Sequence, residues 1–118
     1  MTVEVESLAP KTGQLTIDIQ LSATVNVTAF SARQKVTGFL ADEISTNMHG
    51  GEPSLAVGER ICWRVPVILS MPPTGDRGQV GTIDVDVETG QLSVSRSLIE
   101  EIKQRAEHLA SHHSLSPT

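Results

Sequence analysis

The chain has 118 residues, a formal net charge of −5 and an aromatic content of only 3%. Its size fits one domain with a mainly aliphatic core. Because its nine basic residues are scattered along the chain, we expect it to bind neither nucleic acid nor a membrane surface.

The first predicted elements are strands. Val3 and Val5 alternate with two glutamates, which predicts a short strand that opens a hairpin. Alternation is strict from residue 15 to 27, where every odd position is apolar: Leu15, Ile17, Ile19, Leu21, Ala23, Val25 and Val27. At about 3.4 Å per residue this strand would span about 44 Å, which is long for a small domain. It either bends at a bulge or projects, and we expect a second copy or another partner to dock on its polar face (Thr16, Gln20, Thr24) or its projecting end.

The periodicity then changes to that of a helix. Between Ser31 and Met48 the apolar positions lie three and four apart: Ala32, Val36, Phe39, Leu40, Ile44 and Met48. This spacing predicts an amphipathic helix with Thr28 or Ser31 as N-cap and Gly50-Gly51 after its end. Gly38 inside it costs up to about 1 kcal/mol relative to alanine, so we expect another element to approach closely there.

Alternation returns from Ile61 to Met71, with Trp63 on one face and Arg60, Cys62 and Arg64 on the other. Pro66 cannot donate a ladder hydrogen bond, so the strand is expected to lie at an edge there or to be bulged. Trp63 is expected to face the helices as the largest core residue. In the opposite register, Trp63 and the arginines would form an interaction hot spot on an open face.

The sequence pattern after residue 71 predicts a hairpin and a second helix. Residues 72–78 form a loop dense in Pro, Gly and Asp, and alternation over 82–87 leads through the turn 88–90 into residues 91–95. Ser97 and Glu100 have capping-box spacing, and Leu98, Ile102, Ala106 and Leu109 mark the helix. The simplest architecture is α+β, a curled antiparallel sheet with two α-helices packed on one face. We expect one domain over residues 1–110 and a flexible tail over 111–118.

Candidate chemistry is sparse. Asp84 and Asp86 share a strand face and could bind a cation or act in acid-base catalysis, although a solvated sheet face also carries such residues. His108 and His112 have zinc-compatible spacing but lie where the helix is expected to fray. Cys62 could be activated by its flanking arginines or could simply fill a second sheet layer. We therefore expect no catalytic residue, metal or cofactor.

The expected compartment is the cytoplasm. Cys62 is the only cysteine, which excludes an internal disulfide framework. The N-terminus is acidic and alternating, without the basic and apolar regions of a signal peptide. The most apolar run, residues 65–71, contains Pro66 and is too short to span a bilayer.

Two stretches of the sequence resemble known bacterial proteins. They are Gly58-Glu-Arg-Ile-Cys-Trp-Arg-Val-Pro-Val67 and Gly81-Thr-Ile-Asp-Val-Asp-Val-Glu-Thr-Gly90, which look like a family of uncharacterised small proteins. The helix, the strand with Trp63 and the valine-aspartate-x-x-threonine-glycine hairpin are also similar to PepSY-type domains. That resemblance, over about half the chain, implies a cystatin-like helix on a curled sheet and a link to protease inhibition or regulation.

Two functions remain open. The first is a non-catalytic protein-interaction or regulatory module, expected to be a homo-oligomer because an unpaired edge or exposed sheet face is usually covered. The alternative is a small-molecule-binding or enzymatic pocket between the sheet and the first helix, with a mouth lined by Trp63, Phe39 and Met71. The candidate interaction or pocket residues are Trp63, Arg60, Arg64, Phe39, Asp84 and Asp86.

Overall fold

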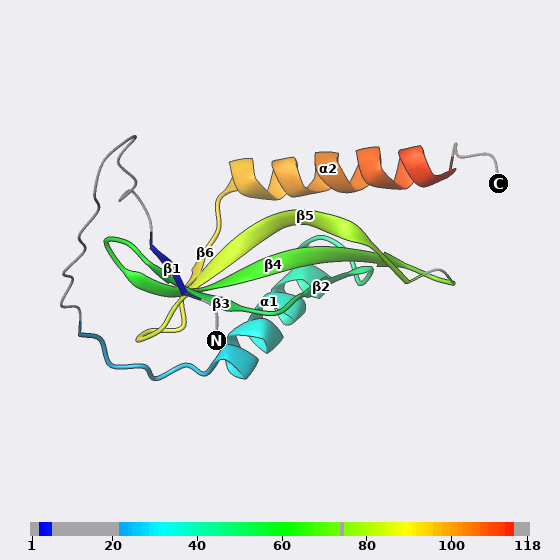
Figure 1. The fold of residues 1–118 in the computed structure, drawn as a ribbon. Helices are drawn as coiled ribbons and strands as arrows, with labels where there is room; N and C mark the ends of the chain where they lie inside the picture. The colour runs from blue at the N-terminus through cyan, green and yellow to red at the C-terminus, as the bar shows by residue number, and fades with distance from the viewer. Residues whose placement is uncertain (1–2, 6–21, 74, 115–118) are drawn as a thin grey trace, which may run out of the picture.

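A computed structural model of the chain describes residues 3–5, 22–73 and 75–114. Two helices and an open sheet form an α+β fold, as the sequence predicted (Figure 1). In chain order the elements are β1 (Val3–Val5), α1 (Ala29–Glu43), β2 (Met48–Gly50), β3 (Ser54–Val57), β4 (Ile61–Met71), β5 (Gly75–Asp86), β6 (Leu92–Ser93) and α2 (Arg96–Ser114).

The long strand β4 is the centre of the sheet. Along one side it pairs with β5, and along the other it pairs first with β3 and then with β2. The strand order is β1-β3-β4-β5-β6, with β2 beside β4 and off this path. Strands β2 to β6 pair antiparallel, whereas β1 runs parallel to β3.

Of the two alternatives for Pro66, the edge strand is wrong because β4 is central, whereas an irregularity does lie next to it, in the β4–β5 register between Val67 and Ile68. On the side opposite β5, the β3 pairing ends at Arg64 and the β2 pairing begins at Val67. Pro66 lies in the gap between them, where its carbonyl accepts the Gly51 N–H at 2.8 Å. The N and O of a strand residue point to the same side, so the missing proline donor faces this gap and no ladder bond is lost.

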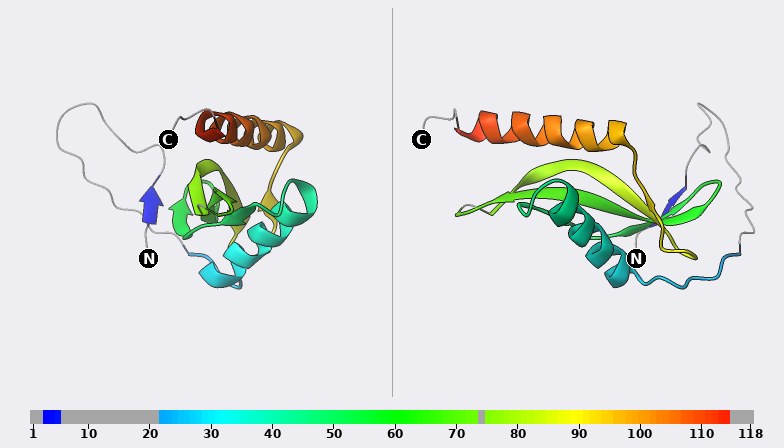
Figure 2. Two further views of the ribbon diagram at one scale, coloured as in Figure 1. Left: turned by 90° about the vertical axis from the view of Figure 1, so that its right-hand side faces the viewer. Right: turned by 180° about the vertical axis from the view of Figure 1, so that it is seen from behind.

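Both helices pack on one face of the sheet, as predicted. Val67 pairs with Gly50 on one side and with Gly81 on the other, so these three residues share a face. A Cβ on Gly50 would lie 3.0 Å from the Arg33 carbonyl of α1, and one on Gly81 would lie 2.7 Å from Ile102 Cγ1 of α2. The helices follow the two margins of this face (Figure 2).

Two bulges in β5 direct the strand toward α2. The β4–β5 register shifts between Val67 and Ile68 and again between Leu69 and Ser70. Val80 is the extra residue at the first shift, so inward-facing positions change from odd numbers at Gly81 to even numbers at Gly78. β5 arches up under α2 as a result, and its glycine-rich first part replaces much of the predicted 72–78 loop (Figure 1).

The core is aliphatic with Trp63 as its largest member, as predicted. Trp63 is 7% exposed and lies among fully buried residues of the sheet and α1, including Val36 and Leu40. Its indole Nε1 donates to the Val27 carbonyl at 2.6 Å. This bond satisfies the one polar group that the tryptophan brings into the core.

The first helix begins as predicted and ends earlier. The Thr28 hydroxyl accepts the Ser31 N–H at 3.0 Å, which confirms Thr28 as the N-cap. The chain turns after Glu43, so Met48 lies in β2 and not in the helix. β2 then packs against α1, where Gly50 bonds to Thr37 Oγ1 and Arg33 Nε at 2.9 Å each. The expected close neighbour of Gly38 is absent, since no described atom lies within 4 Å of a Cβ built there.

The second helix also differs at both ends. Its N-cap is Ser95, whose hydroxyl accepts the Leu98 N–H at 3.1 Å, so the predicted capping box at Ser97 is wrong. Helix α2 continues to Ser114, past the predicted domain end at 110. No helix in the described part of the chain has the length and apolarity needed to cross a membrane.

The strand predicted over residues 15–27 is not seen in its described part. Residues 15–21 lie outside the described residues, as do the docking positions Thr16 and Gln20. Residues 22–27 have no strand structure, and Thr24 donates its backbone N–H to Glu88 Oε1 at 3.0 Å. The N–H groups of Asn26 and Val27 both donate to the Val87 carbonyl. Within residues 22–27 Val27 is buried whereas Val25 is 55% exposed, so these described residues do not form a buried strand face.

Candidate functional site

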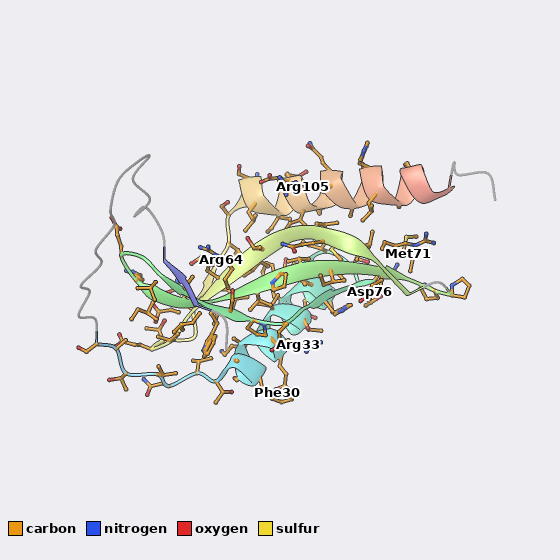
Figure 3. All side chains as sticks on the ribbon, viewed as in Figure 1. Phe30, Arg33, Arg64, Met71, Asp76 and Arg105 are labelled. Carbon is orange, nitrogen blue, oxygen red and sulfur yellow. The ribbon has the colours of Figure 1, made fainter. Side chains whose placement is uncertain are left out.

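The charged candidates meet on the outer face of the sheet, opposite the helices. Arg64 on β4 lies directly across from Asp84 on β5. Its Nε is 3.0 Å from Asp84 Oδ1 and its Nη2 is 3.1 Å from Oδ2, so the pair is bidentate. Arg64 is near the β3–β4 end of the sheet in Figure 3.

Asp86 closes the turn that joins β5 to β6. Its Oδ1 accepts the backbone N–H groups of Glu88 at 2.8 Å and Thr89 at 3.0 Å. These bonds, with Thr89 contributing most, hold the pKa of Asp86 below its ordinary value of 3.8. Arg60 approaches the other oxygen at 3.6 Å while its side chain stays 77% exposed, so this ion pair is loose.

Cys62 lies between these two ion pairs. Burial is the main reason that the pKa of its thiol is raised, and Asp84 and Asp86 raise it further. Arg60 and Arg64 act in the opposite direction but less strongly. The thiol therefore stays protonated at neutral pH, which favours the second of the two alternatives for Cys62, a small residue that fills the outer layer of the sheet.

Three hollows surround Arg60 at this end of the molecule. They measure about 370, 330 and 210 Å³, and Arg60 lines all of them. The first reaches the segment at Ser22 and the turn at Thr89, the second reaches β6, and the third reaches β3. The described residues in their walls carry both charge signs but no convergent set of catalytic groups.

Trp63 and Phe39 are not part of this cluster. Trp63 lies on the opposite, helix-covered face, and Phe39 of α1 packs half-buried against the core. Met71, the third residue of the proposed pocket mouth, lies at the far end of the sheet from Arg64 (Figure 3). The space between α1 and β4 is occupied by Val36, Leu40 and other fully buried side chains.

A second polar cluster lies at the far end of the outer face. The Ser70 hydroxyl donates to Asp76 Oδ1 and lies 3.4 Å from His49 Nδ1, while His49 Nε2 is 3.9 Å from the same carboxylate. A nucleophilic serine needs its hydroxyl bonded to the imidazole, and here the carboxylate takes that bond. No periodic signal points to this cluster, because His49 directly follows the helical spacing that ends at Met48, whereas it lies on β2 opposite Ile68.

A groove of about 380 Å³ lies between β5 and α2, and no sequence signal pointed to it. Val80 and Leu109 contribute its apolar part, and its polar part comes from Gln79, Glu101, Gln104, Arg105 and His108. The groove lies beside an open sheet edge. Within the described residues, β6 pairs only with Asp84 and Val85, so the rest of β5 has no strand on that side.

Comparison with known proteins adds no identity. No family model, no curated protein and no solved structure matches the chain. Among the described residues, no three His, Cys, Asp or Glu side chains are grouped so as to hold a metal ion.

Proposed function

We propose that this protein is a non-catalytic interaction or regulatory module that works as a homo-oligomer in the cytoplasm. The observation that carries this proposal is the open edge of β5 beside the groove under α2. An unpaired edge presents free N–H and C=O groups, and native proteins cover such edges. Self-association covers the edge with a surface that every copy already carries.

The chemistry of the outer face supports a non-catalytic role. Asp84 is held in a bidentate pair, and Asp86 is bound by turn amides that favour its charged form. A general base is tuned toward neutral pH, whereas the pKa of Asp86 is moved away from it. Cys62 has a raised thiol pKa, which disfavours a nucleophilic thiolate.

Sedimentation velocity across the micromolar range tests self-association. We expect the weight-average mass to rise with concentration toward that of a dimer. Phe30 is 68% exposed on α1 and does not line the groove, so the control Phe30→Ser removes exposed apolar surface elsewhere and should leave the mass unchanged. A strictly monomeric wild-type protein over the whole range contradicts the proposal.

A further inference from the structure

Building on the proposed homo-oligomer, we infer that two copies join β5 to β5 in antiparallel register, about a twofold axis between Val80 and Gly81. The occupant of the open edge and groove is thus a second copy of this chain. Three observations support this axis. They are the outward direction of the N–H and C=O groups of Gln79 and Thr82, the position of α2 along β5, and the charged residues on α2.

The backbone of Thr82 points to the open edge. Thr82 pairs with Pro66, whose carbonyl accepts the Gly51 N–H and so points away from β5. In an antiparallel sheet, the backbone N–H and C=O groups of two paired residues either point toward the partner strand in both residues or point away from it in both. The N–H and C=O of Thr82 therefore face outward, where no described strand pairs with them.

The backbone of Gln79 points to the same edge. Gln79 pairs with Ile68, and the flanking β4 residues Pro66 and Ser70 both bond toward the β2 side, Ser70 through its N–H to the Asn47 carbonyl at 2.7 Å. Ile68 shares their direction, so Gln79 faces outward as Thr82 does. A twofold axis between Val80 and Gly81 places Gln79 of each copy opposite Thr82 of the other. Each of these two Gln79–Thr82 pairs can then form two backbone N–H···O bonds.

Helix α2 carries complementary charges at the level of this axis. Ile102 approaches Gly81 and Leu109 approaches Gly78, so α2 runs antiparallel to β5 with Gln104 near the axis. Glu101 and Arg105 lie on either side of Gln104 along the groove and form an exposed ion pair at 2.6 Å. The twofold rotation brings Glu101 of each copy toward Arg105 of the other.

The bulge at Val80 limits the strand pairing to a few residues, so the groove and helix contacts are needed as well. The second copy covers the apolar part of the groove, formed by Val80 and Leu109. Short edge pairing combined with a complementary helix pair makes the contact specific for this chain.

Charge exchange on α2 provides the decisive experiment. Glu101→Arg places only positive charge on this flank and Arg105→Glu only negative charge, so each variant alone should self-associate at least roughly tenfold more weakly. An equimolar mixture of the two should restore the wild-type dimer mass in sedimentation velocity. Glu100→Arg and Lys103→Glu alter another exposed ion pair of α2 that does not line the groove, and they should leave the dimer unchanged.

A backbone test addresses the strand pairing. Thr82→Pro removes the outward N–H without touching the β4 ladder, whereas Thr82→Ala keeps it. We expect the proline variant to stay folded by circular dichroism and to lose the dimer, and the alanine variant to keep it. A wild-type dimer that survives Glu101→Arg, Arg105→Glu and Thr82→Pro overturns this interface but not the homo-oligomer. A wild-type monomer overturns both.

Discussion

Single residues at the ends of the core hold distant segments together. The Trp63 indole reaches the Val27 carbonyl and anchors the irregular segment 22–27 against the sheet. Gly81 lets Ile102 of α2 approach β5 more closely than any side chain would allow. The tryptophan was predicted as a core residue from alternation, whereas its hydrogen bond was not, because Val27 was assigned to a strand.

Trp63→Phe should lower the free energy of unfolding by about 1–3 kcal/mol, because it leaves the Val27 carbonyl without its donor and creates a small void. Urea unfolding followed by circular dichroism measures the loss. Phe30→Leu, at an exposed position, is the matched control and should stay within about 0.5 kcal/mol of wild type. A Trp63→Phe variant as stable as this control would show that the bond contributes little.

Gly81→Ala should destabilise the fold by about 1–3 kcal/mol, since its Cβ would lie 2.7 Å from Ile102 Cγ1. Gly38→Ala is the matched control in α1, where the new methyl group meets no described atom within 4 Å. That control should stabilise the protein by up to about 1 kcal/mol through helix propensity. Thermal or urea unfolding of both variants checks the opposite signs.

At the scale of elements, hydrophobic periodicity predicted the long strand and the helices and missed the short strands. β4 and α1 have enough alternating or helical positions to be recognised, and their inward faces were assigned correctly. β3 spans only Ser54–Val57, and β2 holds Met48 at a position that also continues the helical spacing of α1. The first part of β5 is rich in glycine and bulged, so its sequence is typical of a loop.

The candidate site was predictable only in part, because periodicity assigns residues to faces but does not show their partners. Alternation placed Arg60 and Arg64 on one face of their strand and Asp84 and Asp86 on one face of theirs, but it could not show that the arginines bind these carboxylates. The groove under α2 depends on the Val80 bulge and on the angle of a helix, and neither leaves a periodic signal. Trp63 and Phe39 were expected to line a pocket between the sheet and the first helix, but fully buried side chains such as Val36 and Leu40 fill that space.

The β5–β6 turn should give the fold a specific acid sensitivity. The folded-state pKa of Asp86 lies below its ordinary value of 3.8, so its carboxylate stabilises the fold above 3.8. This contribution is lost as the pH falls from 3.8 through the lowered value. Asp86→Asn cannot titrate, so the stability difference from wild type should shrink over that window. Urea unfolding of both proteins from neutral to acidic pH measures this difference, and a difference that does not change with pH contradicts it.

Strand β4 is the centre of the whole molecule, and the other elements differ in how much they contact it. β4 pairs with β2, β3 and β5 and contributes much of the core, whereas α2 packs mainly on β5. Regions with fewer buried contacts open at lower free energy. Helix α2 should therefore detach from the sheet more readily than the sheet itself opens.

Ile102→Ala should reveal this difference in hydrogen exchange. Ile102 is 1% exposed and is a main apolar contact of α2, so its truncation should cost the α2 docking about 2–5 kcal/mol. Amide exchange in α2 should then accelerate far more than exchange in β4. Equal acceleration in both elements would mean that the fold opens as one unit.

The separation along the chain between paired strands has a consequence for synthesis. β3, β4 and β5 each pair with the next strand in the sequence, so these contacts need only short loops to close. In contrast, β1 pairs with β3 at Leu55, and residues 26–27 bond to Trp63 and Val87, so these contacts form only after much more of the chain has been made. During translation β1 and residues 26–27 therefore leave the ribosome before their partners exist, and we expect them to dock after β3 to β6 have paired.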